Sequence, residues 1–201
     1  MNKAYQEIAA QLIALKNADL NMRDELIARK ELGNGYNTKM ESLHIKNATI
    51  LTGILDKTGF PTINQVGKDG FDAACLIVQH AISQPKFMKR CATLLKSLAK
   101  TDIEAARKFA YLNDRIAVFE NRCQLYGTQF DWDEKGLLSH HMVDDLIAVN
   151  NRRKELGWHS LEEQTEVIRK RAVLENQAVP SDYKKRLSEL HHWKKHVGWI
   201  S

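Results

Sequence analysis

Apolar residues recur at helical spacing along most of the chain, and in three segments a polar side chain takes a position that should face inward. One stripe consists of Ile103, Ala106, Ala110, Asp114 and Ala117. A second consists of Met40, Leu43, Asn47, Ile50 and Ile54. The third segment, 71–82, is apolar around most of its circumference but carries Gln79 and His80. Because burying unpaired polar groups is costly, we expect them to meet one another or a ligand.

The same spacing and the helix-end signals predict a mostly α fold, a single-domain helical bundle with at most one short β-hairpin or ordered loop. Helices are predicted over 4–29 (as one or two), 38–56, 71–82, 85–99, 101–119, 142–156, 160–179 and 181–197. Their caps are expected to include Thr38, Thr101, Ser160 and Ser181. Gly33-Asn34-Gly35 should break the chain, 58–70 should be an ordered loop, and the residues after Asn121 should form the hairpin or loop.

Charge separates the end of the chain from the rest. The net charge is +5, and all of this excess lies in residues 168–201, since positive and negative residues balance in 1–167. We therefore expect a helical domain over 1–167, which carries the candidate polar pocket, and a basic C-terminal helical extension over 168–201. Such an extension can bind an acidic protein or nucleic acid, or it can be a solvated helix face.

Composition excludes several classes of protein. No segment approaches the roughly 20 apolar residues that span a bilayer, and the N-terminal segment has no signal-peptide core, so we expect a soluble, cytoplasmic protein without membrane contact. Three cysteines without CxxC spacing argue against a disulfide framework and a structural zinc site, and Cys75 and Cys91 are expected in the core. Nucleotide-binding glycine motifs and a serine-hydrolase elbow are absent from the sequence.

The buried polar residues suggest acid/base chemistry. If His80 and Asp114 are neighbours, the carboxylate can fix the imidazole tautomer and raise its basicity, as catalysis requires. The alternative is a buried hydrogen bond that only joins helices. Arg115 can clamp an anion or form a surface salt bridge. The loop residues Gln124, Tyr126, Thr128 and Gln129 offer neutral donors and acceptors that can orient a polar ligand or simply pack as a turn.

A metal site is the less favoured reading of the same residues, and no metal is assigned. Glu41 and His44 have ExxH spacing, which puts both side chains on one helix face. With His80 and Asp114 they would form a four-ligand set of nitrogen and oxygen donors. However, ferritin-like di-iron proteins use two ExxH units, and only one occurs in this sequence.

Three motifs in order, Gln79-His80-Ala81, Ala110-Tyr111-Leu112-x-Asp114-Arg115 and Gln124-x-Tyr126-Gly127-Thr128-Gln129, resemble those of a bacterial domain-of-unknown-function family. The similarity extends upstream and covers roughly residues 19 to 160, with Phe60 where that family has tryptophan. The resemblance implies no reaction, cofactor or fold. It does imply that the family uses the polar residues chosen above, and it favours a functional pocket over scaffolding.

Two hypotheses follow from the sequence. In the first, the chain is a hydrolase- or transferase-like enzyme or a binder of a small polar or anionic ligand. His80 and Asp114 carry its catalysis; its ligand-binding residues are His44, Asn47, Gln79, Arg115, Gln124, Tyr126, Thr128 and Gln129. In the second, the His/Asp cluster is structural and the basic tail binds an acidic partner. The sequence identifies neither a cofactor nor an oligomeric state.

Overall fold

The computed structural model describes residues 2–32 and 35–201, so Gly33 and Asn34 of the predicted chain break lie outside the described residues. By its contacts the chain divides into two compact units, residues 1–95 and 96–201, and each is described by itself. The described residues form eight helices and one two-stranded antiparallel hairpin. The predicted mostly α fold is therefore confirmed.

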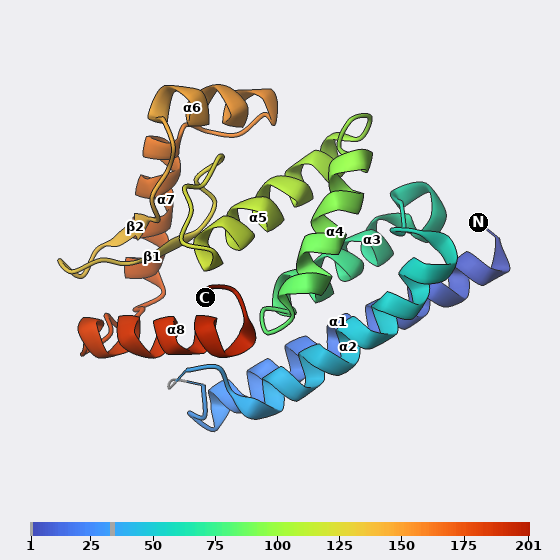
Figure 1. Ribbon diagram of the computed structural model, residues 1–201, viewed down its shortest axis with the longest axis horizontal. Helices are drawn as coiled ribbons and strands as arrows, with labels where there is room; N and C mark the ends of the chain where they lie inside the picture. Colours follow the sequence, from blue (N-terminus) through green and yellow to red (C-terminus); the bar gives the residue numbers. More distant parts are fainter. Residues whose placement is uncertain (1, 33–34) are drawn as a thin grey trace. The chain divides into compact units, whose positions relative to one another are not determined.

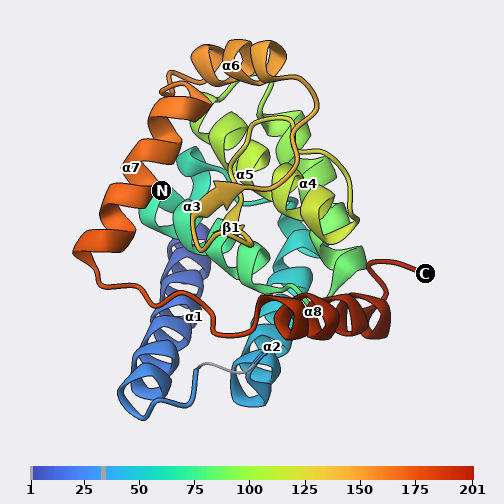
Figure 2. The same cartoon turned by 90° about the vertical axis from the view of Figure 1, so that its left-hand side faces the viewer.

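Three long helices build the first unit. They are α1 (Lys3–Ala28), α2 (Thr38–Thr58) and α3 (Ile63–His80); α4 (Pro85–Leu98) begins in this unit. α1 packs on α3 and α2, and α1 and α2 lie side by side (Figures 1 and 2). The approach of α1 to α3 needs a small residue, since a Cβ at Gly70 would lie 3.3 Å from that of Ala9. Since α1 is continuous over Lys3–Ala28, the segment predicted as one or two helices is one helix.

The predicted loop over 58–70 is wrong in its second half, because α3 already begins at Ile63. Thr62 and Gln65 form a capping box that starts the helix. Gly67 then adopts φ 73°, which kinks the helix before the buried segment that was predicted. Two glycines in this stretch thus shape a helix rather than a loop.

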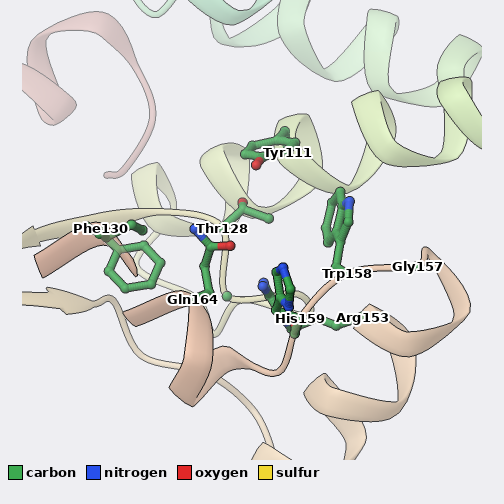
Figure 3. Close-up of a pocket in the computed structure, with 10 residues that line it drawn as sticks. Tyr111, Thr128, Phe130, Arg153, Gly157, Trp158, His159 and Gln164 are labelled. Atoms are coloured by element: carbon green, nitrogen blue, oxygen red, sulfur yellow. Dashed lines mark hydrogen bonds between the residues drawn. The ribbon is translucent and has the colours of Figure 1, made fainter. Parts of the chain in front are cut away.

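The second unit combines four helices with the hairpin. Its elements are α5 (Ile103–Phe119), β1 (Phe130–Trp132), β2 (Leu138–His140), α6 (Leu146–Glu155), α7 (Leu161–Leu174) and α8 (Tyr183–Val197). In the hairpin, Asp131 pairs with Ser139. A pocket of about 290 Å³ is lined by side chains from α5, α6, α7 and the loops between them (Figure 3).

Several helix caps differ by one residue from the prediction. Asn37, Asp102 and Asp182 cap α2, α5 and α8 with their side chains, in place of the neighbouring Thr38, Thr101 and Ser181. Each accepts a hydrogen bond from backbone amides of the first helical turn. The predicted capping box of Ser160 with Glu163 is confirmed at α7.

The basic C-terminal segment packs within the second unit. The expected boundary at 167/168 falls inside α7, which is continuous. Lys194 is buried, and its ammonium group donates to the Val118 carbonyl at 2.8 Å. Arg186 forms an ion pair with Asp131 at 2.7 Å, and Arg169 donates to the Leu138 carbonyl. Part of the tail's charge is therefore committed to internal contacts.

Two exclusions drawn from the composition agree with the described residues. Cys75 and Cys91 are buried and form no disulfide, as predicted for small core residues. None of the described helices is both long and apolar enough to cross a membrane.

Candidate functional site

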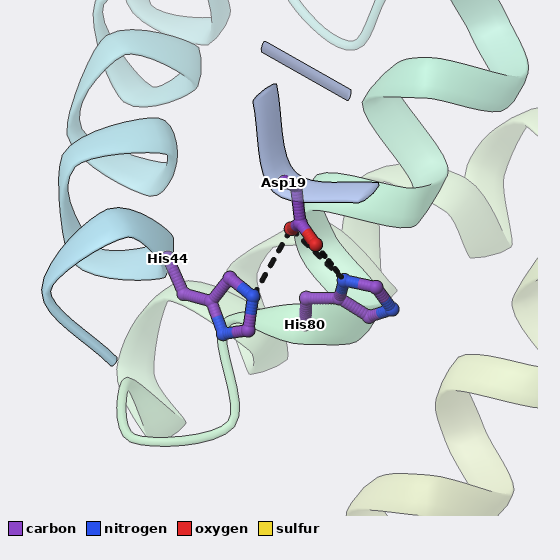
Figure 4. Close-up of side chains that lie close together, drawn as sticks. All are labelled: Asp19, His44 and His80. Atoms are coloured by element: carbon purple, nitrogen blue, oxygen red, sulfur yellow. Dashed lines mark hydrogen bonds and ion pairs between the residues drawn. The ribbon is translucent and has the colours of Figure 1, made fainter. Parts of the chain in front are cut away.

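One buried carboxylate in the first unit is shared by two histidines. Asp19 of α1 is completely buried, and its Oδ2 lies 2.9 Å from Nδ1 of His80 and 3.1 Å from Nε2 of His44 (Figure 4). His44 lies on α2 and is 6% exposed, and His80 is the last residue of α3. Three helices therefore deliver one oxygen and two nitrogen donors to one point, with all donor atoms within 4.8 Å of one another.

The two histidines contact Asp19 differently. The contact from His80 Nδ1 is a hydrogen bond to the carboxylate. His44 Nε2, by contrast, lies at ion-pair distance from Oδ2 but forms no hydrogen bond there, because distance alone does not give the required direction. The contact of His44 with Asp19 is therefore close but poorly directed for proton donation.

Tyr36, in the segment between α1 and α2, contacts the outer side of this cluster. Its hydroxyl lies 2.5 Å from Nδ1 of His44 and donates to the His80 carbonyl at 3.3 Å. Burial, together with the charges of Glu41 and Asp19, raises the pKa of Tyr36 above its ordinary value. The phenol therefore stays neutral and can act as a hydrogen-bond partner that fixes the His44 ring.

The electrostatic balance favours the charged form of Asp19. Burial by itself would raise the pKa of this carboxyl, but the hydrogen bond with His80 and the close charge contacts with His44 and His80 outweigh burial and hold the pKa below its usual range. The cluster therefore contains an ionised carboxylate out of contact with water.

Asp114, which the sequence analysis paired with His80, has a different set of contacts in the second unit. Its carboxylate accepts hydrogen bonds from the backbone amides of Leu125, Tyr126 and Thr128 and from the Thr128 hydroxyl. Burial raises its pKa, although these hydrogen bonds oppose the shift. The carboxylate that contacts His80 is Asp19. The prediction thus identified a buried acid correctly but not the partner of the imidazole.

The remaining predicted residues of the loop mostly form hydrogen bonds with one another. Gln124 is fully buried, and its side-chain amide donates to the main-chain carbonyls of Gln129 and His141. Its side-chain carbonyl accepts from the main-chain amide of Gln129. Arg115 donates to the Gln129 side chain at 3.1 Å, and burial lowers its pKa. These contacts order the loop over α5, and ligand binding by Arg115, Gln124, Tyr126, Thr128 and Gln129 stays a prediction.

Of the predicted metal set, only His44 and His80 come together. Among the described residues, the ligand group is completed by Asp19; Glu41 is not part of it, and Asp114 belongs to the other unit. Asn47, one turn beyond His44, is buried and donates to the Leu15 carbonyl at 3.4 Å, so it links α2 to α1. Gln79 is half-buried beside His80 in the chain.

Sequence reasoning missed Asp19 and Tyr36. A signal for Asp19 was present, because it continues the stripe of Ile8, Leu12 and Leu15 on α1 with the same spacing that identified Asn47 and Asp114. No helical pattern marks Tyr36, since it lies in a connecting segment.

A family model, that of a family of unknown function, matches residues 6–175. No curated protein and no solved structure matches the chain. The expectation of a family without an assigned function is confirmed, over a longer range than the 19 to 160 expected. The three motifs and a bacterial origin stay predictions.

Proposed function

Because the chain belongs to the family of unknown function DUF6624, no relative supplies an activity, and we propose from geometry that Asp19, His44 and His80 bind one divalent transition-metal ion. In this proposal the ion serves hydrolysis or group transfer on a small polar substrate. The observation that carries it is the convergence of two imidazoles and one buried carboxylate from three helices. Two histidines with one carboxylate are a recurrent donor set for catalytic zinc and non-haem iron.

The donor spacing suits a single ion. Ligand atoms about 2.1 Å from a metal and at right angles to each other lie about 3.0 Å apart. The distances from Asp19 Oδ2 to the two histidine nitrogens are 2.9 and 3.1 Å. The carboxylate thus stands at the separation from both imidazoles that neighbouring ligands of one ion would have.

The proton arrangement around His44 supports the same assignment. The Tyr36 hydroxyl has one proton, and if it donates to the His80 carbonyl it must accept one from Nδ1 of His44. Nε2 of His44 then presents a lone pair toward the Asp19 carboxylate. Two lone pairs facing each other need a proton or a metal ion between them, and in this proposal the metal ion takes that place. A tyrosine behind a histidine ligand is also a typical outer partner of metal sites.

Access to the site is on the His80 side. The His80 side chain is 27% exposed, whereas Asp19 is 0% exposed. Catalytic metal sites retain a coordination position for water or substrate, and structural sites do not. A metal-bound water is far more acidic than free water, so the ion would supply a nucleophile near neutral pH. Tyr36 would hold the His44 imidazole in position.

We expect the purified 201-residue chain, with any affinity tag removed, to hold close to one equivalent of zinc, iron, manganese or cobalt. The measurement is elemental analysis by plasma mass spectrometry, followed by reloading with each ion and recording the thermal midpoint. His44→Ala and His80→Ala should each abolish both binding and the metal-induced stabilisation, because each removes a ligand.

The control must exclude adventitious binding by surface histidines. His191 and His192 are adjacent on α8 and both are exposed, so the double variant His191→Ala/His192→Ala should keep its metal. Failure of all four ions to bind or stabilise the wild-type chain would refute the proposal. So would full metal content in both cluster variants.

Tyr36→Phe tests the outer partner of His44. Removing the hydroxyl leaves Nδ1 of His44 without its 2.5 Å contact, and we expect the metal affinity to fall about 10- to 100-fold. Competition with a chelator of known affinity measures the change. Tyr5→Phe is the matched control, since its hydroxyl accepts from Gln65 in the same unit and away from the ligands. Equal affinity loss in both variants would contradict the assigned role.

A further inference from the structure

The pocket of the second unit contains a buried guanidinium without a carboxylate partner. Arg153 of α6 is 3% exposed; its Nε donates to the His159 carbonyl at 2.7 Å and its Nη1 to the Tyr126 carbonyl at 2.9 Å. Among the described residues it forms no ion pair, and its Nη2 makes no hydrogen bond. A buried cation whose contacts are neutral carbonyls and an aromatic ring is costly unless an anion can reach it.

The charged groups around Arg153 do not compensate for the missing carboxylate partner. Burial lowers the pKa of Arg153, and the charge interactions with Tyr111, Asp114 and Glu162 only partly oppose this. The Asp114 carboxylate is itself engaged by three loop amides. Since Arg153 lines the pocket, an anion entering it could meet the unused side of the guanidinium (Figure 3).

The other walls are aromatic and polar. Tyr111 is 47% exposed, and its ring centroid lies 5.4 Å from that of Trp158, with the rings edge to face. The Trp158 ring in turn lies 5.6 Å from the Arg153 guanidinium carbon. Gln164 also faces the pocket, and its side-chain amide makes no hydrogen bond with the described residues. Flat apolar walls thus stand beside one cation and one free amide.

We propose that this pocket binds a small organic carboxylate with a flat, aromatic body. The carboxylate would pair with Arg153, the ring would lie against Tyr111 and Trp158, and a polar substituent would reach Gln164. The volume of about 290 Å³ is at the lower end for ligand sites and fits a single ring rather than a dinucleotide. All residues of this pocket belong to the second unit, whereas the ligands of the proposed metal site belong to the first.

The test uses benzoate as probe, with benzamide as its neutral analogue and inorganic phosphate as an anion without a ring. Binding to the full chain, treated with chelator so that metal plays no part, is measured by calorimetry and by shifts of assigned amide signals. We expect benzoate to bind at least tenfold more tightly than benzamide or phosphate. The shifts should centre on residues 126–128 and 157–164.

Variants on the accessible wall keep the test independent of folding. Tyr111→Ala and Gln164→Ala should each weaken benzoate binding severalfold or more, while Tyr183→Ala and Gln177→Ala on the same unit should not. Arg153→Gln should abolish it, provided the variant folds. The proposal is overturned if benzoate does not saturate the protein at millimolar concentration, or if benzamide binds equally well. Phosphate binding that equals benzoate binding and ignores Tyr111→Ala would also overturn it.

Discussion

Asp114→Ala is expected to destabilise the protein by about 3–6 kcal/mol, because each buried donor left without an acceptor costs about 1–3 kcal/mol. The carboxylate accepts from the loop amides of Leu125, Tyr126 and Thr128 and from one hydroxyl, at 2.9–3.2 Å. No other described side chain accepts from these amides. Such a loss approaches the total stability of many domains. Urea unfolding followed by circular dichroism measures the change in the free energy of unfolding.

The matched control for this prediction is Asp133→Ala in the hairpin turn. Asp133 accepts from the amides of Lys135 and Leu137 and from the Ser139 hydroxyl, so it makes a similar set of hydrogen bonds. Those donors lie at the surface, where water can replace the lost acceptor, and the expected loss is much smaller. Comparable losses in the two variants would show that burial of the loop amides is not the cause.

The role of Asp114 shows what periodicity can and cannot predict. Its position on an apolar stripe correctly indicated burial and the need for partners, since both follow from helical spacing alone. The main-chain partners are the amides of Leu125, Tyr126 and Thr128, and their approach depends on the path of the loop. Every residue except proline has such an N–H group, so no side-chain pattern marks the ones that converge on a carboxylate.

The helix caps differ from the prediction for a local reason. Asn37-Thr38, Thr101-Asp102 and Ser181-Asp182 each place two good capping side chains next to each other. Which one caps depends on the residue at which the backbone leaves the extended conformation, as at Asn37, where φ is −62° and ψ is 128°. A difference of one residue leaves the helix in place, and for this reason the fold class was predictable.

The two histidines of the candidate site were predictable from the sequence, and its other residues were not selected. His44 and His80 were selected because the faces of α2 and α3 on which they lie are otherwise apolar, and the structure brings them together. Asp19 obeyed the same rule on α1 and could have been included. Arg153 and Trp158, which line the pocket of the second unit, could not have been selected from the sequence, because α6 has few buried residues and shows no clear apolar stripe.

Asp19→Asn separates a metal centre from a structural hydrogen-bond network more sharply than any other substitution. Asparagine keeps the size of the side chain and one neutral oxygen but removes the charge that faces both imidazoles. In a metal site this should lower the affinity at least 100-fold, a loss greater than that expected for an outer partner. At an ion concentration 100 times the wild-type dissociation constant, wild-type protein should gain about 2.7 kcal/mol and the variant almost nothing.

The stability of the metal-free proteins also distinguishes a metal centre from a structural network. If the cluster exists to bind an ion, removing the charge should affect the stability of chelator-treated protein less than that of loaded protein, because an ionised carboxylate in a buried site is itself costly without its cation. Asp24→Asn, an exposed position on the same helix, should change neither state. The opposite pattern, in which Asp19→Asn destabilises the metal-free chain and added metal never stabilises the wild type, would make Asp19 a structural link between α1, α2 and α3. Thermal midpoints of the three proteins, each with and without metal, decide between these two roles.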